Sequence, residues 1–486
     1  MLSLVIFLPL VVAVPLAAFR LPGRVAAWAR VAASAVDLAL VVRMWAGHRG
    51  GLGYEERLRW MPSVGAGYHV GVDGLSLPLI AMTALLFLLC AGYSLREPRR
   101  PRAYAALFLF LQTVSTGLFA ALDLLLFFVF FDLSIVGMYF VIVGWGHGDR
   151  ARSALKFFLY TFLGSLALLL GFIGLYLGSE PHTFDMVELT AHPSRAGALV
   201  LLAIGVGLAV KTPTVPFHTW LPPAHTDAPA AGSAILAGVL LKMGTYGFAR
   251  IALPMLPEAW RSYARVVIVI GVVSVLYGAL VALAQENLKR LVAYTSVNHM
   301  GYIVLAFGAA GLAGGTPARE LAVSGAVVQM VSHGLVTGAL FLLTGVLWDR
   351  AESYELGRYG GLAGRAPVLT GLTAVAVFAS LGLPGLSGFI AEFQIFTGVI
   401  GAGAVWAGAL AILGILITAA LFLRVLHRAF LGSPGELTPR VTDVRPRELA
   451  AIAPLLALSL AIGLVPRWLL DVVEPASAAI VNLVSR

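Results

Sequence analysis

Residues 124–143 read LLLFFVFFDLSIVGMYFVIV, an apolar run of twenty residues with a single charge, Asp132. An α-helix needs about 20 apolar residues to cross the hydrocarbon core of a bilayer. A transmembrane barrel would instead show short segments of alternating hydrophobicity. The run therefore predicts a membrane-spanning helix.

The composition of the whole chain extends this prediction. Of 486 residues, 59% are hydrophobic and 12% are charged, and the mean hydropathy is +0.92. Soluble domains carry about 25% charged residues, so this composition excludes a soluble enzyme. Nucleic-acid binding is excluded as well, because the basic residues behind the net charge of +9 lie in short loops between apolar runs. We predict an all-α polytopic membrane protein.

Apolar runs between Gly, Pro and charged residues predict about 14 transmembrane helices. A polar loop, residues 47–71, separates the second from the third. The predicted segments are 2–19, 26–46, 72–95, 103–122, 124–146, 154–178, 196–222, 231–250, 263–284, 291–311, 321–348, 368–400, 403–430 and 449–470.

The distribution of Lys and Arg predicts the orientation of these segments. Loops after odd-numbered segments hold most of the basic residues, and such loops remain in the cytoplasm. The N-terminus begins apolar at once, without a basic region, which indicates a retained first span rather than a cleaved signal. We expect a multi-pass protein of the bacterial plasma (inner) membrane with both termini on the non-cytoplasmic side.

Two segments are interrupted in the middle. The seventh contains LAVKTPTVPFHTWLP (208–222), in which Pro213 and Pro216 remove helical donors, and the twelfth contains LGLPGLSGFIAEF (381–393), with Pro384. Prolines can simply kink membrane helices, but paired discontinuous helices also mark ion or substrate sites. The spacing fits two five-helix repeats, helices 4–8 (103–252) and 9–13 (262–431). Residues 1–102 hold helices 1–3 and the polar loop, and residues 432–486 hold helix 14 and a tail.

Four ionisable residues lie within apolar segments: Asp132, Lys211, Lys242 and Glu392. Each costs about 2.5–3.5 kcal/mol at a helix centre unless it is paired or hydrated. Structural ion pairs would account for them, and so would an ion pathway. The chain has only four lysines against 29 arginines, yet both mid-span basic residues are Lys. A buried lysine can release its proton, whereas arginine cannot, which favours proton transfer.

Four histidines accompany these charges: His218, His225, His299 and His333. Imidazole can relay protons near neutral pH, although a membrane histidine can equally serve as a hydrogen-bond partner between helices. No metal-ligand spacing is evident, Cys90 is the single cysteine, and no dinucleotide or Walker motif occurs. We expect no cofactor or metal in this chain. Asp37 in the second segment has no evident role.

Several long motifs resemble the antiporter-like proton-pumping subunits of respiratory complex I, NADH-quinone oxidoreductase, above all the subunit M (chain 4) type. The resemblance covers about residues 70–430. It rests on VKTPTVPFHTWLPPAHTDAPAAGSAILAGVLLKMGTYGFAR (210–250), ENLKRLVAYTSVNHMGY (286–302), VQMVSHGLVTGALF (328–341) and LGLPGLSGFIAEF (381–393).

The resemblance implies two inverted five-helix repeats and a hydrated central axis of charged residues. By position, Asp132 is then the carboxylate paired with Lys211, and Lys242 is the central lysine. His299 and His333 would connect it to Glu392, the exit carboxylate. Glu392 and the absence of a long lateral helix beyond residue 470 favour the subunit M type over its sister L. The family usually has Glu at position 132, so the reach of the shorter Asp132 to Lys211 is in question.

The resemblance also implies partners. Other membrane subunits of complex I, including neighbouring antiporter-like subunits, would surround the chain in the lipid bilayer, and subunits with FMN and iron–sulfur clusters would supply redox energy for moving protons. Two alternatives share these helices: the D-type member of an Mrp sodium/proton antiporter complex and a membrane hydrogenase chain. A third is a structural subunit whose axis no longer conducts. Co-purifying subunits would separate complex I from the two transport alternatives.

Overall fold

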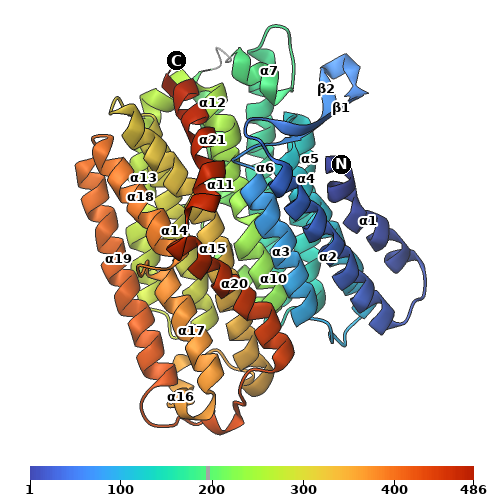
Figure 1. The fold of residues 1–486 in the computed structure, drawn as a ribbon, viewed down its shortest axis with the longest axis vertical. Coiled ribbons are helices and arrows are strands. Elements are labelled where there is room, and N and C mark those ends of the chain that lie inside the picture. Colours follow the sequence, from blue (N-terminus) through green and yellow to red (C-terminus); the bar gives the residue numbers. More distant parts are fainter. Residues whose placement is uncertain (193–196, 486) are drawn as a thin grey trace.

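Long apolar helices stand side by side along the vertical axis of the molecule (Figure 1). The computed structural model describes residues 1–192 and 197–485. Within these residues ten helices are long and apolar enough to cross a membrane, and five apolar helices are shorter. The apolar run 124–143 lies in α5 (Leu124–Trp145). The all-α fold class is confirmed.

The N-terminal layer contains α1 (Leu2–Ala18), α2 (Gly23–Gly47) and α3 (Leu77–Tyr93). Between α2 and α3, the predicted polar loop forms an antiparallel hairpin of β1 (Gly53–Met61) and β2 (Ala66–Val72), which are joined by η1 (Pro62–Val64). The hairpin turns at Gly65, whose φ of 65° favours glycine.

The next helices correspond to predicted segments four to eight. The seventh segment is broken, as predicted, between α8 and α9, and residue 196 at its predicted start lies outside the described residues. The eighth contains two π-helical turns, η2 and η3. In order the elements are α4 (Pro101–Ala120), α5, α6 (Arg150–Leu177), α7 (Met186–Ala191), α8 (Ala198–Lys211), α9 (Leu221–Asp227), α10 (Ala230–Ile235), η2 (Leu236–Leu240), α11 (Lys242–Gly247), η3 (Phe248–Ala252) and α12 (Leu253–Met255).

The following helices correspond to segments nine to thirteen. The longest, α15, lies at the centre, where α14, α18, α20 and α21 pack around it. The twelfth segment is broken between α17 and α18, again as predicted. The elements are α13 (Pro257–Leu283), α14 (Leu288–Ala310), α15 (Thr316–Ala351), η4 (Leu356–Arg358), α16 (Leu362–Arg365), α17 (Pro367–Ser380), α18 (Ser387–Gly401), α19 (Val405–Val425), η5 (Leu426–Phe430) and η6 (Thr438–Arg440).

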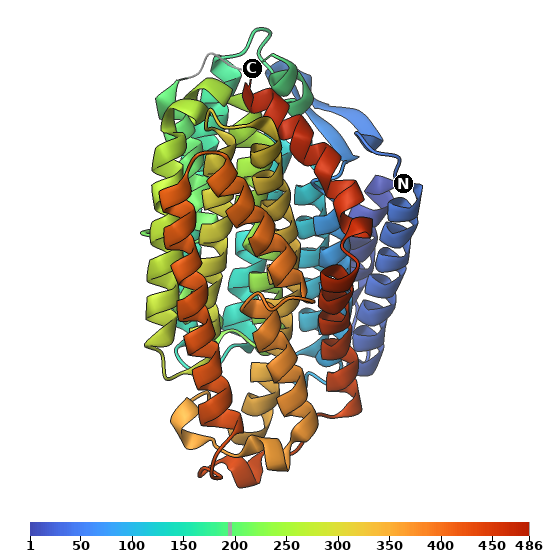
Figure 2. The ribbon, with the colours of Figure 1, turned by 60° about the vertical axis from the view of Figure 1, so that its left-hand side comes forward.

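The C-terminal region differs from the prediction. Segment fourteen corresponds to α20 (Pro446–Leu464), but the predicted tail is a further helix, α21 (Arg467–Ser485). Pro466 ends α20 because proline cannot continue a helix, and α21 then continues from it toward the end of the bundle where the C-terminus lies (Figure 2). The prediction of a tail after helix 14 was therefore wrong, because a helix of 19 residues occupies that region. The buried side chains of α21, such as Leu469, Val473 and Val481, recur at helical spacing.

The two ends of the bundle have different contents. The hairpin, α7 and the C-terminus lie at one end, the N-terminus lies in the same half, and α16 lies at the opposite end (Figure 1). The loops at the α16 end include residues 94–100 and 352–366, which are rich in arginine. We call this end the arginine-rich end.

Candidate functional site

The break between α8 and α9 places Lys211 on the last turn of α8, where its side chain is buried. Irregular backbone at membrane depth must find its partners within the protein. The amide of Val215 donates to Ser274 Oγ on α13 at 3.0 Å, and Trp220 Nε1 donates to the carbonyl of Val210 at 2.9 Å. These bonds hold the break in a defined conformation beside Lys211.

Lys211 does not form the expected ion pair. Its Nζ donates to Ser134 Oγ at 2.8 Å and lies 4.7 Å from the ring centroid of Phe131. Across the part of the chain that the structure describes, no ion pair joins Lys211 to Asp132, and the buried Oδ1 of Asp132 has no hydrogen-bond partner. Ser134 stands two residues after Asp132, so the amine takes the hydroxyl instead of the short carboxylate.

Lys242 is fully buried at the start of α11, directly after a π-helical turn. The amide of Leu241 donates to Leu236 O, five residues back, which leaves Ala237 O without the usual amide partner four residues on. Lys242 Nζ donates to Ala237 O at 2.6 Å and lies 2.6 Å from His333 Nδ1. The distance fits a proton on either atom: a protonated Lys242 donates to an unprotonated Nδ1, and a protonated Nδ1 donates to a neutral Lys242 amine.

The histidines continue the contact from Lys242. His333 Nε2 is 3.1 Å from Ser296 Oγ, and the rings of His333 and His299 meet edge to face with centroids 5.4 Å apart. His299 Nδ1 lies 3.1 Å from Gln329 Nε2, and its Nε2 lies 3.1 Å from Ser380 Oγ. Ser380 ends α17, so the second break contacts the histidine pair directly.

Glu392 lies at the far end of this line. Its Oε1 is 3.8 Å from His299 Nδ1, and 4% of the residue is exposed. The break between α17 and α18, which contains Pro384, makes room for it: Gly382 has a φ of 73°, and a Cβ there would collide with the Glu392 carboxylate. Glycine is therefore needed for both backbone and space. Lys242, His333, His299 and Glu392 form one buried line across α11, α15, α14 and α18.

The supporting histidines lie beside this line. His225 on α9 is fully buried, stacks on Phe341 at 4.5 Å between ring centroids, and has no hydrogen-bond partner at either ring nitrogen within residues 1–192 and 197–485. The charges of Lys289 and Lys242 both act on it. His218 lies in the first break and meets the Tyr277 ring edge-on at 5.0 Å.

Sequence reasoning missed Lys289. Position 289 lies between the predicted segments 263–284 and 291–311, but Lys289 is fully buried on the first turn of α14. Its Nζ donates to Ala228 O at 2.5 Å and lies 5.2 Å from the Tyr354 ring centroid. The scarcity of lysine in the chain was a usable signal. The hydroxyl and amide partners Ser134, Ser296, Gln329 and Ser380 were also missed, because single polar residues leave no periodic pattern.

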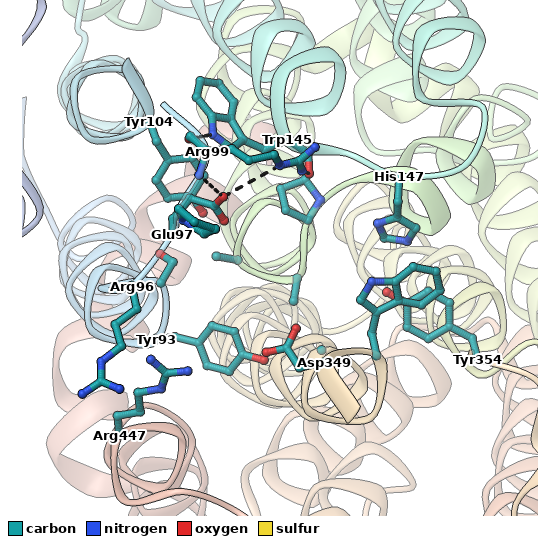
Figure 3. Close-up of a pocket in the computed structure, with 17 residues that line it drawn as sticks. Tyr93, Arg96, Glu97, Arg99, Tyr104, Trp145, His147, Asp349, Tyr354 and Arg447 are labelled. Carbon is teal, nitrogen blue, oxygen red and sulfur yellow. Dashed lines mark hydrogen bonds and ion pairs between the residues drawn. The ribbon is translucent and has the colours of Figure 1, made fainter. Parts of the chain in front are cut away.

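A cavity of about 260 Å³ opens at the arginine-rich end (Figure 3). Glu97, Arg99, His147, Asp349 and Tyr354 are among its lining residues, and Tyr93 points toward Asp349 from the opposite wall. The His147 ring stacks on Trp348 at 4.1 Å. Burial, followed by the charge of Lys289, lowers the pKa of His147 to about 3, so this histidine is neutral at physiological pH.

Two discontinuous helices beside a buried line of ionisable side chains are the architecture of an ion-transporting membrane protein. The described residues contain no group of three or more His, Cys, Asp or Glu side chains that could hold a metal ion.

Comparison with known proteins gives the family. The family described as "NADH:quinone oxidoreductase/Mrp antiporter, TM" matches residues 121–418, and this chain belongs to it. It is an integral, multi-pass membrane protein. NADH-quinone oxidoreductase subunit M of Rickettsia prowazekii is 40% identical over 86% of this chain and 84% of its own length. The Rhodobacter capsulatus subunit of the same name is 36% identical over 99% of this chain and 96% of its own length.

Solved structures agree. A chain of respiratory complex I from Thermus thermophilus superposes with a TM-score of 0.91 at 31% identity, with all of both chains covered. A chain of the Mrp complex from Dietzia sp. superposes with a TM-score of 0.88 at 23% identity, over 99% of this chain and 98% of its own, which shows a shared fold.

Proposed function

We propose that this chain is a proton-translocating membrane subunit of an NADH:quinone oxidoreductase and carries no redox centre itself. The observation that carries the proposal is the buried line from Lys242 through His333 and His299 to Glu392, with atoms 2.6 Å apart at one end and 3.8 Å apart at the other. A line of titratable groups this close can pass a proton by short transfers. Partner subunits supply the energy of electron transfer from NADH to quinone.

The proton moves through named atoms. Lys242 Nζ passes its proton to His333 Nδ1, and His333 releases the proton on Nε2 toward Ser296. Ser296 lies one turn before His299 on α14, and a water or a ring rotation completes the step to His299. From there the proton reaches Glu392. Moving one charge against 100 mV requires about 2.3 kcal/mol.

Lys211 controls when Lys242 releases its proton. If Asp132 holds Lys211, the Lys242 amine feels less positive charge and keeps its proton. When Lys211 moves toward Lys242, repulsion expels that proton along the line. In the present conformation Lys211 is held by Ser134, which is neither of these two states. Lys289, which donates to the carbonyl of Ala228 at the end of α9, and His225 on α9 provide the entry side of the path.

The proposal includes the arrangement in the membrane. Residues 103–252 and 262–431 act as two inverted repeats, between the N-terminal helices (1–102) and the C-terminal region (432–486). The arginine-rich end faces the cytoplasm of a bacterial cell and both termini face outward, since basic loops stay inside. Neighbouring antiporter-like subunits flank the chain in the complex.

The test is substitution of Lys242 in the assembled complex, reconstituted into vesicles, with NADH oxidation and proton uptake measured together. We expect Lys242→Ala to abolish proton translocation, and Lys242→Arg to abolish it too, because arginine retains its proton. Lys156→Arg is the matched control, since Lys156 is an exposed lysine at the start of α6. Normal pumping by Lys242→Arg would refute the role of the amine.

An Mrp-type antiporter subunit is the alternative, favoured by the shared fold alone. Purification of the chain from its native membrane decides between them. NADH-oxidising, iron–sulfur subunits in the purified complex support the proposal, and their replacement by other antiporter subunits contradicts it. A purely structural role predicts normal pumping in every Lys242 variant.

A further inference from the structure

A second polar cluster lies outside the Lys242 line, between α2 and α4. Asp37 on α2 is fully buried, and its Oδ2 accepts a hydrogen bond of 2.7 Å from Gln112 Nε2 on α4. Gln112 Oε1 in turn accepts from Ser34 Oγ at 2.7 Å. The other carboxyl oxygen, Oδ1, is buried without a partner among the described residues. Nothing in the proposed proton pathway uses this acid.

No ion pair in the described part of the chain includes Asp37, and its hydrogen-bond partner is Gln112. The nearest basic residue on its own helix is Arg43, six residues later and about 9 Å along the axis, and Arg30 lies seven residues earlier. Arg30 donates through Nη2 to the carbonyl of Ala91 and to Ser94. An unpaired carboxylate inside a membrane is unfavourable, and the group takes up a proton instead.

The helices packed against α2 bring no charge to the level of Asp37. α1 has no titratable side chain, α3 contributes Cys90 and Tyr93, and α4 contributes Tyr104 and Arg102. Arg102 stands ten residues before Gln112, about 15 Å along the helix axis, and donates to the carbonyl of Phe19. Both Cys90 and Tyr104 lie at the level of Arg30 rather than of Asp37. Protonation is therefore the means by which Asp37 becomes neutral.

The surroundings of Asp37 suit water. Thr113, Ser115 and Thr116 on α4 are buried, and none of their hydroxyls has a hydrogen-bond partner in the described chain. Ser115 and Thr116 lie one turn beyond Gln112 on the same face of α4. Buried polar atoms that lack protein partners are the atoms that internal waters satisfy. Water there would carry a proton to or from Oδ1.

The cluster is also connected to the cavity at the arginine-rich end. Ser94 lines that cavity, and so does Tyr104 (Figure 3). Arg30 contacts both, through a 3.1 Å hydrogen bond to Ser94 Oγ and a 4.9 Å approach to the Tyr104 ring centroid. Arg30 Nε and Nη1 are buried without partners in the described residues. Ser34 stands one turn from Arg30 on the same face of α2, so a polar stripe leads from the cavity wall to Asp37.

We propose that Asp37 is a second proton-binding site, separate from the Lys242 line and loaded with protons from the cavity at the arginine-rich end. A simple clamp between α2 and α4 would need only the hydrogen bond to Gln112, which an amide in place of the acid could also make. The inference does not depend on pumping through Lys242.

Infrared spectroscopy of the whole complex in lipid, with isotope-labelled aspartate, tests the proposal. We expect a carbonyl band of a protonated aspartic acid that is lost in Asp37→Asn, that shifts on deuteration, and that changes with the pH of the medium. Asp37→Asn preserves the side-chain shape and the hydrogen bond to Gln112, so assembly is expected.

A second variant covers the case in which Asp37→Asn fails to assemble. Gln112→Leu removes the donor to Oδ2, so the same band should move to the frequency of a less strongly hydrogen-bonded acid. Identical spectra for the native complex and whichever variant assembles would overturn the site. A band that disappears with Asp37 but ignores deuteration and pH would overturn loading from the cavity and leave the clamp as the explanation.

Discussion

Gly382→Ala should uncouple the exit end of the proton line while leaving the fold largely intact. Gly382 has a φ of 73°, and the carboxylate of Glu392 occupies the space that a Cβ would fill. Placing alanine in this left-handed conformation costs about 1–2 kcal/mol. The methyl group also forces Glu392 to rotate away from His299, to which its Oε1 is now 3.8 Å distant.

The effect on proton transfer follows from that distance. With His299 protonated and Glu392 charged, attraction at 3.8 Å is about 4.4 kcal/mol at an effective dielectric constant of about 20, and about 2.8 kcal/mol at roughly 6 Å. The difference, about 1.6 kcal/mol, corresponds to a roughly tenfold lower population of the protonated histidine that delivers its proton to Glu392. We expect proton translocation per NADH oxidised to fall by a similar factor.

Gly385→Ala is the matched control. Gly385 lies in the same break with a φ of 94°, so alanine there is strained as well, but its Cβ would meet only Leu464 Cδ2 at an ordinary 3.8 Å. Both variants should lower the resistance of the complex to unfolding by a similar amount, measured by thermal inactivation. Only Gly382→Ala should reduce proton uptake in reconstituted vesicles. Equal pumping losses in the two variants would show that backbone strain, and not the position of Glu392, is responsible.

Two further predictions concern parts of the chain outside this line. Asp185 caps α7 and accepts hydrogen bonds from His69 and Arg57; burial alone would raise its pKa, but these bonds lower it to about 2 from 3.8. A carboxyl group whose pKa is lowered on folding stabilises the folded state at pH values above its pKa in the unfolded chain. This stability is lost as the pH falls from about 4 through about 2. Asp185→Asn should therefore reduce the hydrogen-exchange protection of the hairpin by about 1–2 kcal/mol at pH 7, after allowance for the solvent around half-exposed Arg57. The substitution should also abolish the loss of this protection at acid pH. An unchanged acid dependence of the protection would contradict the assignment. Arg350 forms a buried pair with Glu448 at 2.7 Å that joins α15 to α20, so Glu448→Gln should cost about 3 kcal/mol, seen as a lower inactivation temperature, and a change within error would show that the arginine finds other partners.

Sequence reasoning predicted the features that depend on long patterns. Apolar runs located the helices, and Pro213, Pro216 and Pro384 located the breaks. Proline has no amide hydrogen to donate, so it interrupts the hydrogen bonds of a helix in any context. It also named the residues of the line from Lys242 to Glu392, which the fold brings together from four helices. It could not predict α21, because Arg467 and Asp471 interrupt an apolar run although the helix buries only one side.

Other features depend on distances that no pattern contains. Whether Lys211 contacts Asp132 or Ser134 depends on the relative positions of their side chains, which are set only when α5 and α8 are placed side by side. The unpartnered oxygen of Asp37 could not be recognised for the same reason: its environment is built by Gln112, 75 residues away in the chain. The burial of Lys289 required the position of the α9–α10 connection, whose carbonyls hold its amine.

For the proposed pathway, the hydrogen bonds indicate the step at which proton transfer would be controlled. From Lys242 to Glu392 the polar groups are already close, but Lys211 contacts Ser134, and no hydrogen bond joins it to Asp132 or Lys242 in the described chain. In the proposed pathway the side from Lys242 to Glu392 needs only a water or a ring rotation between Ser296 and His299, whereas the side chain of Lys211 must leave Ser134 before it can act on Lys242. The break after Lys211 offers little backbone freedom, since its amide and indole donors are held. Rotation of the Lys211 side chain away from Ser134 is therefore the motion that the proposed pathway requires, and Ser134 competes with Asp132 for the same amine.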